Sequence, residues 1–439
     1  MLLKLVDGFE SLALRTAPAQ AVRLLGAVPA SVLAALQRSR FRRTLRLAAE
    51  RSPFYREQFR RRGIDVRGID HPSELGDFYT TGEDLRRAGG EAFLTARPET
   101  VFETTGTTSA VPKRVFFSTR ELNESGCASS VALRVLGLRK DDVVASAFDC
   151  SFWVSPAVLR SALQYVGCFH VEAGKIPPEE FYERAKHYRP TVIFGEPSWL
   201  VRLAEVVRER GGWPLKFMLA GGENLTEPAR QAVEDVWHAP LYLNYGQTEA
   251  FGALGIECQT KQGYHRDDMH FIFEICGGRE GELVYTTLTR HVMPLIRYRS
   301  SDVTRLVNDP CPCGVRINRI AKIRSRVDEM VVCGMGNVGP WVFEQLLEDV
   351  PASDWQVVVT NDDHRDMVEL TVEVEDLSSR FRIEDAVRLA LRERFPDFSR
   401  NLAMKLYDLR VATALRGTLR NGRKIRRVID DRRMVAAST

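Results

Sequence analysis

The segment from Thr104 to Lys113 is rich in hydroxyl groups. It reads Thr104-Thr105-Gly106-Thr107-Thr108-Ser109, and Pro112 and Lys113 follow. A glycine lets backbone N–H groups converge, hydroxyls donate hydrogen bonds and a lysine neutralises charge, so this composition suits a loop around a polyphosphate. The Walker spacing G-x-x-x-x-G-K-[ST] is absent. Taken alone, a threonine-rich loop is more often an ordinary polar turn.

A second polar motif, Asn244-Tyr245-Gly246-Gln247-Thr248-Glu249, follows directly on an apolar run. Ligands of open α/β sheets bind beyond the carboxyl ends of the strands. A tyrosine there can stack on a purine, and the carboxylate of Glu249 can hold Mg²⁺. Gly221-Gly222-Glu223 follows another apolar run in the same way. Either piece alone is also compatible with a capped strand–helix turn.

Two further segments carry single residues of chemical interest. Arg297-Tyr298-Arg299-Ser300-Ser301-Asp302 ends on a carboxylate that can accept both hydroxyls of a ribose. Gly422-Arg423-Lys424-Ile425-Arg426 places a lysine in a basic loop, where it can reach a transferring phosphate. By themselves, an aspartate beside arginine is usually a surface ion pair, and a basic tail is usually solvated.

The elements that must position these residues alternate between apolar runs and helical patterns. We expect buried strands at 141–148, 191–194, 215–220 and 241–245, and helices at 178–187, 198–210 and 227–236. This alternation predicts an α/β fold with a mostly parallel sheet. Two more strands are expected at 271–275 and 281–288.

The pattern changes near Arg326, which predicts a second domain. We expect strands at 330–333, 355–359, 367–374 and 403–408, with helices at 341–347 and 383–394. That order is a small α+β unit of the split βαβ kind. The expected domains are therefore 1–327 and 328–439, joined by a short hinge, since no Pro/Gly-rich linker marks the boundary.

Composition excludes several classes of protein. The 439 residues carry a net charge of only +4, so overall charge gives no case for nucleic acid. The Arg-rich stretch 38–62 has apolar residues at helical spacing and is predicted to form helices with basic outer faces rather than a phosphate-binding surface. No apolar run is long enough for a membrane span, and the first 36 residues are expected to form helices packed on the protein body. Eight scattered cysteines suggest a reducing cytoplasm.

The order of the four motifs along the chain resembles the adenylate-forming superfamily. Further pieces resemble its phenylacetate–CoA ligase and coenzyme F390 synthetase branch: Arg51-Ser52-Pro53-Phe54-Tyr55, Cys311-Pro312-Cys313-Gly314, and the segment 416–430. The resemblance spans roughly Arg51 to Asp430. It implies a large multi-layer α/β adenylating domain with a small α+β lid, and an enzyme that uses ATP to activate a carboxylic acid as an acyl-adenylate.

The resemblance also implies a role for each motif. The ATP phosphates would be held by Thr104, Thr105, Gly106, Thr107, Thr108 and Lys113, and the nucleotide would further contact Gly222, Glu223, Asn244, Tyr245, Gly246, Asp302 and Arg326. Thr248 would contact the α-phosphate, and Glu249 the Mg²⁺. Arg326-Val327-Asp328 would be the hinge of the lid, and Lys424 would enter the site for adenylation.

The chain departs from the family pattern at three places. Ser109 stands where the family usually has glycine, with one residue more before the Pro112-Lys113 pair. Arg423 separates the glycine of the C-terminal loop from Lys424, and Ser325 replaces a glycine. These changes could weaken ATP handling or only reshape it.

Four residues form a candidate metal set: Cys258, His265, Cys311 and Cys313. Three thiolates and one imidazole would make a closed tetrahedral zinc site of the structural kind. The spacings are not the strong C-x₂-C pairs, so four ordinary thiol and imidazole side chains remain an alternative. The resemblance favours the metal, because members of this branch carry such a set.

The implied reaction has two steps: the acid attacks the α-phosphate of Mg·ATP to give an acyl-AMP, and a thiol then takes the acyl group. Coenzyme A is the expected acceptor; a carrier-protein thiol or an amine stays open, as does a homodimer. By family position the acid would pack near 148–153, 195–198 and Gly246, where Trp153 and Phe152 would suit an aromatic acid or be core aromatics. A non-catalytic ligand-binding homologue and a zinc-containing nucleic-acid binder are the alternatives from other classes.

Overall fold

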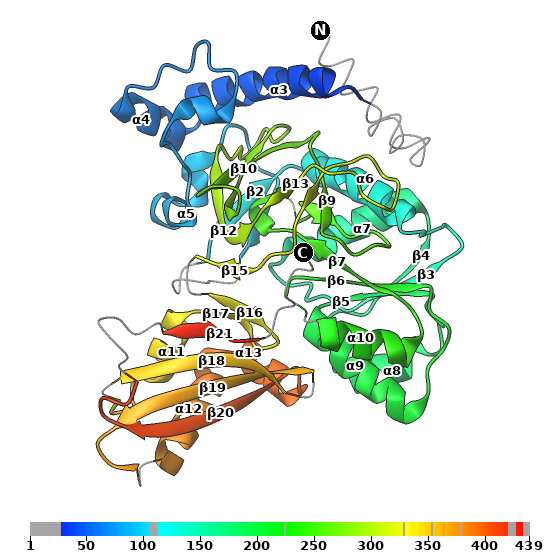
Figure 1. Ribbon diagram of the computed structural model, residues 1–439, viewed down its shortest axis with the longest axis vertical. Coiled ribbons are helices and arrows are strands. Elements are labelled where there is room, and N and C mark those ends of the chain that lie inside the picture. The colour runs from blue at the N-terminus through cyan, green and yellow to red at the C-terminus, as the bar shows by residue number, and fades with distance from the viewer. Residues whose placement is uncertain are drawn as a thin grey trace.

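The computed structural model describes residues 28–104, 112–223, 225, 227–250, 252–327, 330–352, 354–362, 364–377, 380–419 and 427–432. A larger part holds the main sheet and its helices, and a smaller part is built from the residues after 330 (Figure 1). The helices expected for the first 36 residues fall largely outside the described residues, which begin at Val28.

The main sheet has nine strands. Their order is β13 (Leu306–Val307), β14 (Arg319–Ile320), β9 (Tyr264–Arg266), β8 (Gly255–Ile256), β7 (Leu241–Tyr245), β6 (Phe217–Gly221), β5 (Val192–Gly195), β3 (Val143–Ser146) and β4 (Phe169–Glu172). The five strands from β7 to β4 are mutually parallel, and the others extend the sheet antiparallel. The predicted parallel α/β sheet is thus confirmed, with an antiparallel extension at one side.

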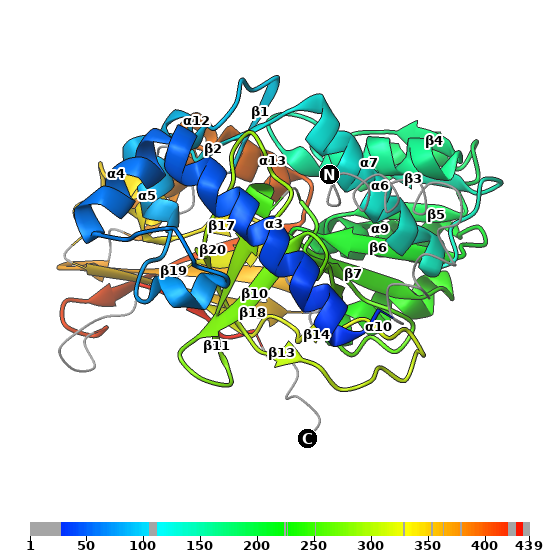
Figure 2. The same ribbon diagram turned by 90° about the horizontal axis from the view of Figure 1, so that it is seen from above.

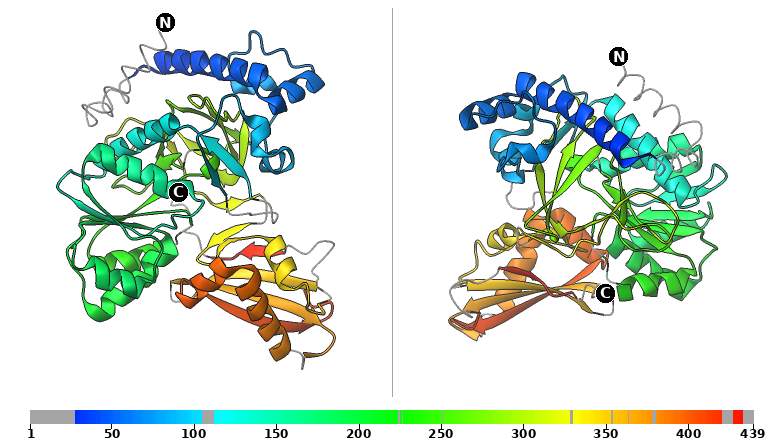
Figure 3. Two further views of the ribbon diagram at one scale, coloured as in Figure 1. Left: turned by 180° about the vertical axis from the view of Figure 1, so that it is seen from behind. Right: turned by 45° about the horizontal axis from the view of Figure 1, so that its top comes forward.

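Helices cover both faces of the parallel strands. α6 (Thr119–Val135) and α7 (Val154–Val166) lie on one face, and α8 (Pro178–Ala185), α9 (Pro197–Arg210) and α10 (Glu227–Trp237) lie on the other (Figures 1 and 3). Every residue of β5 and β6 is buried, as expected for strands enclosed on both sides. Local signals set the helix ends: Ser118 and Glu121 form a capping box on α6, and Gly167, with φ of 81°, ends α7.

A second sheet is antiparallel throughout. It has the order β10 (Phe271–Cys276), β11 (Gly281–Thr287), β12 (Tyr298–Thr304) and β15 (Ser325–Arg326). Burial alternates along β12, so Tyr298, Ser300 and Asp302 all face inward. The hairpin of β1 (Thr100–Glu103) and β2 (Arg114–Phe117) flanks the hydroxyl-rich segment. The inward face of β12 therefore carries polar side chains into the interior of the molecule.

The Arg-rich stretch forms helices, as predicted. α3 (Ala30–Arg51) runs across the outside of the molecule (Figure 2), and α4 (Pro53–Arg62) follows it. Phe41, Leu45, Phe54 and Phe59 are buried, whereas most arginines of these helices are exposed. Among the described residues, no helix is both long and apolar enough to pass through a lipid bilayer.

The residues after 330 have a hydrophobic core of their own. They form the hairpin β16 (Val331–Cys333) and β17 (Gly336–Val338), the helices α11 (Pro340–Leu346), α12 (Arg380–Arg394) and α13 (Pro396–Ala403), and a sheet of β20 (Tyr407–Leu415), β19 (Arg365–Val374), β18 (Asp354–Asp362) and β21 (Val428–Asp430). The strand predicted at 403–408 is wrong in position: α13 runs to Ala403, and the strand begins at Tyr407. Proline at the first helical position and packing of Phe398 on Phe395 favour the extra helix.

The small part touches the large one through both apolar and polar contacts, since Met404 and Leu406 pack in the core of the large part. An Arg400 guanidinium N–H donates to Asp149 at 3.0 Å, and one of Arg365 donates to Glu205 at 2.9 Å. The backbone of Gly334 lies against Ser198, since a Cβ on Gly334 would stand 3.0 Å from the Cβ of Ser198. The hairpin β16–β17 thus reaches the carboxyl ends of the parallel strands.

Candidate functional site

Asp302 is the centre of a buried hydrogen-bond cluster. The Tyr245 hydroxyl and the Gln247 amide each donate to its Oδ2 at 2.7 Å, and the Arg326 guanidinium donates to its Oδ1 at 2.7 Å. Asp302 is only 5% exposed, so these charge-assisted bonds offset the cost of burying the carboxylate. The structure therefore joins three separate sequence motifs at one carboxylate.

Glu249 is the centre of a second cluster next to the first. Its Oε1 lies 2.5 Å from Lys113 Nζ and accepts a hydrogen bond from the Tyr298 hydroxyl at 2.8 Å. Burial raises the pKa of Glu249, but the Lys113 ammonium and the Tyr298 hydroxyl outweigh it and leave that pKa below its usual value. The carboxylate is thus held ionised beside the end of the hydroxyl-rich segment.

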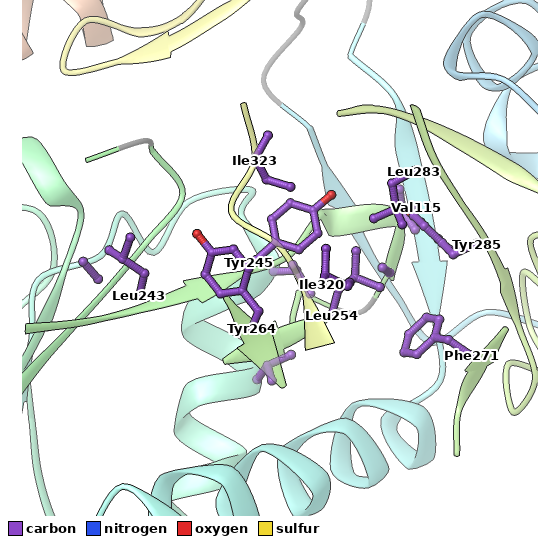
Figure 4. Packing of buried hydrophobic residues seen from close by; sticks show 14 of the residues in the cluster. Val115, Leu243, Tyr245, Leu254, Tyr264, Phe271, Leu283, Tyr285, Ile320 and Ile323 are labelled. Atoms are coloured by element: carbon purple, nitrogen blue, oxygen red, sulfur yellow. The ribbon is translucent and has the colours of Figure 1, made fainter. Parts of the chain in front are cut away.

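The ring of Tyr245 is fixed by apolar packing. Tyr245 and Tyr264 lie side by side, with ring centroids 5.7 Å apart, among Leu254, Ile320 and Ile323 (Figure 4). Because β8 and β9 continue the sheet beside β7, the antiparallel extension supplies this packing. This packing holds the Tyr245 hydroxyl in position to donate to Asp302.

A cavity of about 1240 Å³ connects these clusters to the small part of the molecule. Every predicted nucleotide-binding residue that the structure describes lines it: Thr104, Lys113, Gly222, Glu223, Asn244, Tyr245, Gly246, Thr248, Glu249, Asp302 and Arg326. At the other end the cavity is lined by Met335, Gly336 and Phe398. The volume exceeds the roughly 300–1,000 Å³ of a typical single-ligand pocket, which suits a site for more than one substrate.

Two glycines of the site stand where any side chain would crowd neighbouring atoms. A Cβ on Gly222 would stand 3.1 Å from the Trp153 ring, and Gly222 has φ of 96°, where glycine is favoured. A Cβ on Gly246 would stand 1.2 Å from the Gly252 carbonyl oxygen, so no other residue fits there. Trp153 also meets Phe148 edge to face at 5.3 Å, whereas Phe152 is 64% exposed. Phe148, Phe152 and Trp153 all line the cavity, and Phe148 and Trp153 form its more enclosed aromatic wall.

A polar cluster that sequence reasoning missed lies at the carboxyl ends of β4, β5 and β6. Lys175 pairs with Glu196, and Glu223 accepts hydrogen bonds from the Ser198 backbone N–H at 2.9 Å and from its hydroxyl at 3.0 Å. Lys175, Glu196 and Glu223 all line the cavity. They come from three different strand ends, so no local spacing could have indicated the cluster.

The four predicted metal ligands converge. The ligand atoms of Cys258, His265, Cys311 and Cys313 all lie within 4.8 Å of one another. Cys258 Sγ and Cys311 Sγ are 3.6 Å apart, and Cys313 Sγ is 3.3 Å from His265 Nε2. Four ligands about 2.0–2.3 Å from a tetrahedral zinc ion would be separated by roughly 3.3–3.8 Å, a range that holds both of these distances, and three thiolates with one imidazole are a donor set that zinc takes. His265 Nδ1 contacts the Ile317 carbonyl oxygen at 2.9 Å, which leaves Nε2 to act as ligand.

Several predicted site residues fall outside the described residues: Thr105, Gly106, Thr107, Thr108, Asp328 and Lys424. Gln247 and Tyr298 were part of the motifs but had no predicted role, and both prove to hold a carboxylate of the site. The alternation of β12 would have indicated Tyr298, because it faces the same side as Asp302.

Comparison with known proteins places the chain in a family. The family model described as AMP-binding enzyme matches residues 97–270. A phenylacetate-coenzyme A ligase of Thermus thermophilus is 30% identical over 448 residues, which cover 93% of this chain and 99% of that protein. The chain belongs to the phenylacetate–CoA ligase family of adenylate-forming enzymes. It is an AMP-forming acid–thiol ligase. A second relative, the phenylacetate-coenzyme A ligase of Aromatoleum evansii, is 28% identical over 363 residues, 78% of this chain and 82% of its own length.

A solved structure shares the fold. The crystal structure of 2-hydroxyisobutyryl-CoA ligase in complex with 2-HIB-AMP and CoA matches with a TM-score of 0.77 at 22% identity, covering 93% of this chain and 91% of that chain. The expected fold class, a multi-layer adenylating part with a smaller α+β part, is thereby confirmed.

Proposed function

We propose that this ligase activates a carboxylic acid with ATP as an acyl-AMP and then transfers the acyl group to coenzyme A. The observation that carries the proposal is the single cavity that contains every described nucleotide-binding residue and continues to the small part of the molecule. Family membership at 30% identity over nearly the whole chain supports the same reaction.

Asp302 would bind the ribose. Its carboxylate is a buried acceptor in the wall of the cavity, and two ribose hydroxyls can replace the Tyr245 and Gln247 donors that it now holds. Arg326 would keep Asp302 ionised while the exchange takes place, since its guanidinium binds the other carboxylate oxygen.

Glu249 and Lys113 would hold the Mg²⁺ and the phosphates. The buried, ionised Glu249 is a hard oxygen ligand of the kind that Mg²⁺ prefers, and Mg²⁺ would neutralise charge on the phosphates. Lys113 pairs with Glu249 in the free protein, so phosphate binding would draw its ammonium from the carboxylate onto the phosphate oxygens. Thr104 and Thr248 line the same stretch of the cavity.

Residues 328–439 would act as a mobile lid that rotates about Arg326-Val327-Asp328, with 1–327 as the adenylating domain. The separate hydrophobic core of the residues after 330 supports this division. Lys424 would approach the α-phosphate in one lid position and stabilise the negative charge that develops there.

The acid would pack against Trp153 and Phe148. Their edge-to-face pair gives the cavity an aromatic wall, which suits a flat aryl acid. Relatives named for phenylacetate support an aromatic substrate. A carrier-protein thiol or an amine is the alternative acceptor.

The Cys258–His265–Cys311–Cys313 cluster would hold a structural zinc ion. The fit of the interatomic distances and the orienting contact of His265 support this. All four positions would be occupied by protein ligands, so the ion would staple two loops rather than act on a substrate.

The test is ATP–pyrophosphate exchange over a panel of aryl and alkyl acids, with the wild type, Lys424→Ala and Lys140→Ala. Lys140 is an exposed lysine before β3, at the opposite end of the strands from the cavity, and serves as the matched control. We expect exchange that depends on the acid, falls about 10²- to 10³-fold in Lys424→Ala, and is unchanged in Lys140→Ala. Thioester formation from supplied acyl-AMP and coenzyme A should survive in Lys424→Ala. ATP binding without exchange for any acid would point instead to the non-catalytic alternative.

A further inference from the structure

Glu223 carries a half-buried carboxyl group that lines the cavity beside Gly222. Both of its oxygens accept hydrogen bonds from Ser198, at 2.9 Å from the backbone N–H and 3.0 Å from the hydroxyl. These donors belong to the first turn of α9, which begins at Pro197. The side chain thus points along the strand ends towards the start of α9, beyond β5.

Glu223 lies where the cavity leaves the nucleotide site and meets the smaller part of the molecule. Ser198, its hydrogen-bond partner, touches Gly334 of the β16–β17 turn. Met335 and Gly336 of the same turn line the cavity, as do Lys175 and Glu196. Asp302 and Glu249, the proposed ligands of the ribose and the magnesium ion, lie at the other end of the cavity. A second substrate would therefore approach the acyl group from the end at Glu223.

The charges around Glu223 come from several elements. Glu196 at the start of α9 and Lys175 after β4 form a buried pair next to it. Asp366 of β19 also acts on it electrostatically, and Asp149 after β3 acts on Lys175. Cys333 of β16 is a further ionisable neighbour. Burial, followed by the negative charge of Glu196, raises the pKa of Glu223 to about 8, while Lys175 and the Ser198 N–H lower it.

The second half-reaction needs a proton acceptor. A thiol with a pKa of about 8.5 is mostly protonated at neutral pH, whereas the thiolate is the nucleophile. A base serves best when its own pKa lies close to the working pH. The other carboxylates at this end are engaged by cations: Glu196 by Lys175, and Asp366 by Arg432.

We propose that Glu223 is the base that accepts the proton of the incoming thiol. The S–H bond breaks as the proton passes to the Glu223 carboxylate, and the sulfur attacks the acyl carbonyl carbon of the acyl-AMP. The carbonyl carbon–oxygen bond to the phosphate then breaks, AMP leaves as the anion, and the thioester remains. Glu223 later returns the proton to solvent when the lid moves. This inference rests on the proposed function, because it concerns the second step of that reaction.

The test separates the two half-reactions. Synthetic acyl-adenylate of an acid that supports exchange is mixed with coenzyme A, and thioester formation is followed from pH 6 to 9.5. In the wild type we expect the rate to rise with pH and level off near pH 8. In Glu223→Gln we expect the rate of thioester formation at pH 8 to fall about 10²-fold or more and the inflection near pH 8 to vanish, a loss much larger than the one that the same replacement causes in pyrophosphate exchange.

Two further measurements distinguish a base from a structural residue. Glu196→Gln removes the charge that raises the pKa of Glu223, so the inflection should move to lower pH. Trifluoroethanethiol, a more acidic thiol, should recover much of the rate in Glu223→Gln, because less proton transfer is needed. An unchanged inflection in Glu223→Gln, or an equal loss in both half-reactions at every pH, would overturn the inference. Absence of exchange with every acid would instead refute the proposed function.

Discussion

The replacement Asp302→Asn tests the ribose site most directly. It keeps the shape of the side chain and removes its charge. In the free protein Asp302 accepts from Tyr245, Gln247 and Arg326, all at 2.7 Å. A carboxylate offers about four acceptor positions, so a ribose that brings two hydroxyl donors must displace at least one of these partners.

The size of the effect follows from the hydrogen bonds. A bond to a charged group contributes about 1.5–3 kcal/mol, and a neutral one about 0.5–1.5 kcal/mol. Losing the charge therefore weakens two ribose bonds by roughly 2–3 kcal/mol together, which corresponds to about 30- to 140-fold in affinity. Because the ribose must displace existing donors, we expect the lower end, about 30-fold.

The assay is the KM for ATP in pyrophosphate exchange at saturating acid. The matched control is Asp142→Asn, since Asp142 is also buried and bonded, to Lys216 at 2.9 Å and Thr191 at 2.9 Å. Asp142 precedes β3 and so lies at the amino ends of the parallel strands, away from the cavity. A KM in Asp302→Asn within about three-fold of the wild type, with the control equally active, would refute the assignment of the ribose to Asp302.

Three further outcomes are expected. Elemental analysis should find one zinc ion per chain. The double variant Cys311→Ser, Cys313→Ser should lose the ion and unfold at a lower temperature than the wild type, and a full equivalent of zinc in that variant would refute the site. Glu257→Gln should lower the free energy of unfolding in urea by about 3 kcal/mol, because it removes the buried carboxylate that pairs with Arg230 and leaves only the longer contact with Glu227. Glu384→Gln, at a half-exposed pair within one helix, should cost about 0.5 kcal/mol or less. Lys113→Met removes the cation that most lowers the pKa of Glu249, so that pKa rises. The acid limb of the plot of pyrophosphate-exchange rate against pH should therefore move to higher pH. An acid limb at the same pH as in the wild type would contradict the proposal that Glu249 binds Mg²⁺.

The parallel half of the fold was predictable because its signals are local. The run 241–245 coincides with β7, and the helix expected at 198–210 differs from α9 by a single residue at its start. Strands covered on both faces read as continuous apolar runs, and prolines mark the helix starts. The last predicted strand was misplaced because the helix before it depends on tertiary contacts. Phe398 and Asn401 of α13 are held by Phe395 and by the Met335 carbonyl oxygen, contacts that the local sequence does not announce.

The candidate site was also predictable only in part. Asp302, Tyr245 and Glu249 were predictable as candidates because each stands in a short motif at a strand end. Their mutual contacts were not, since Tyr245 and Asp302 are far apart in the chain and meet only when β12 faces β7. Lys175 and Glu196 had no motif at all. Their importance comes from the carboxyl ends of β4, β5 and β6, which the strand order β6-β5-β3-β4 gathers on the same edge of the sheet as Glu223.

The metal cluster shows why a structural ion would matter to the nucleotide. Cys258 follows β8 and His265 lies in β9, while Cys311 and Cys313 lie between β13 and β14. All of these strands belong to the antiparallel extension, which pairs with β7 through Tyr245 and Gly255. A zinc ion would therefore tie together the strands that pack against the Tyr245 ring and orient its hydroxyl towards Asp302. Loss of the ion should consequently raise the KM for ATP, even though the ion would touch no substrate. In thioester formation from supplied acyl-AMP, the KM for acyl-AMP should rise in the same proportion, because the AMP moiety uses the same ribose site.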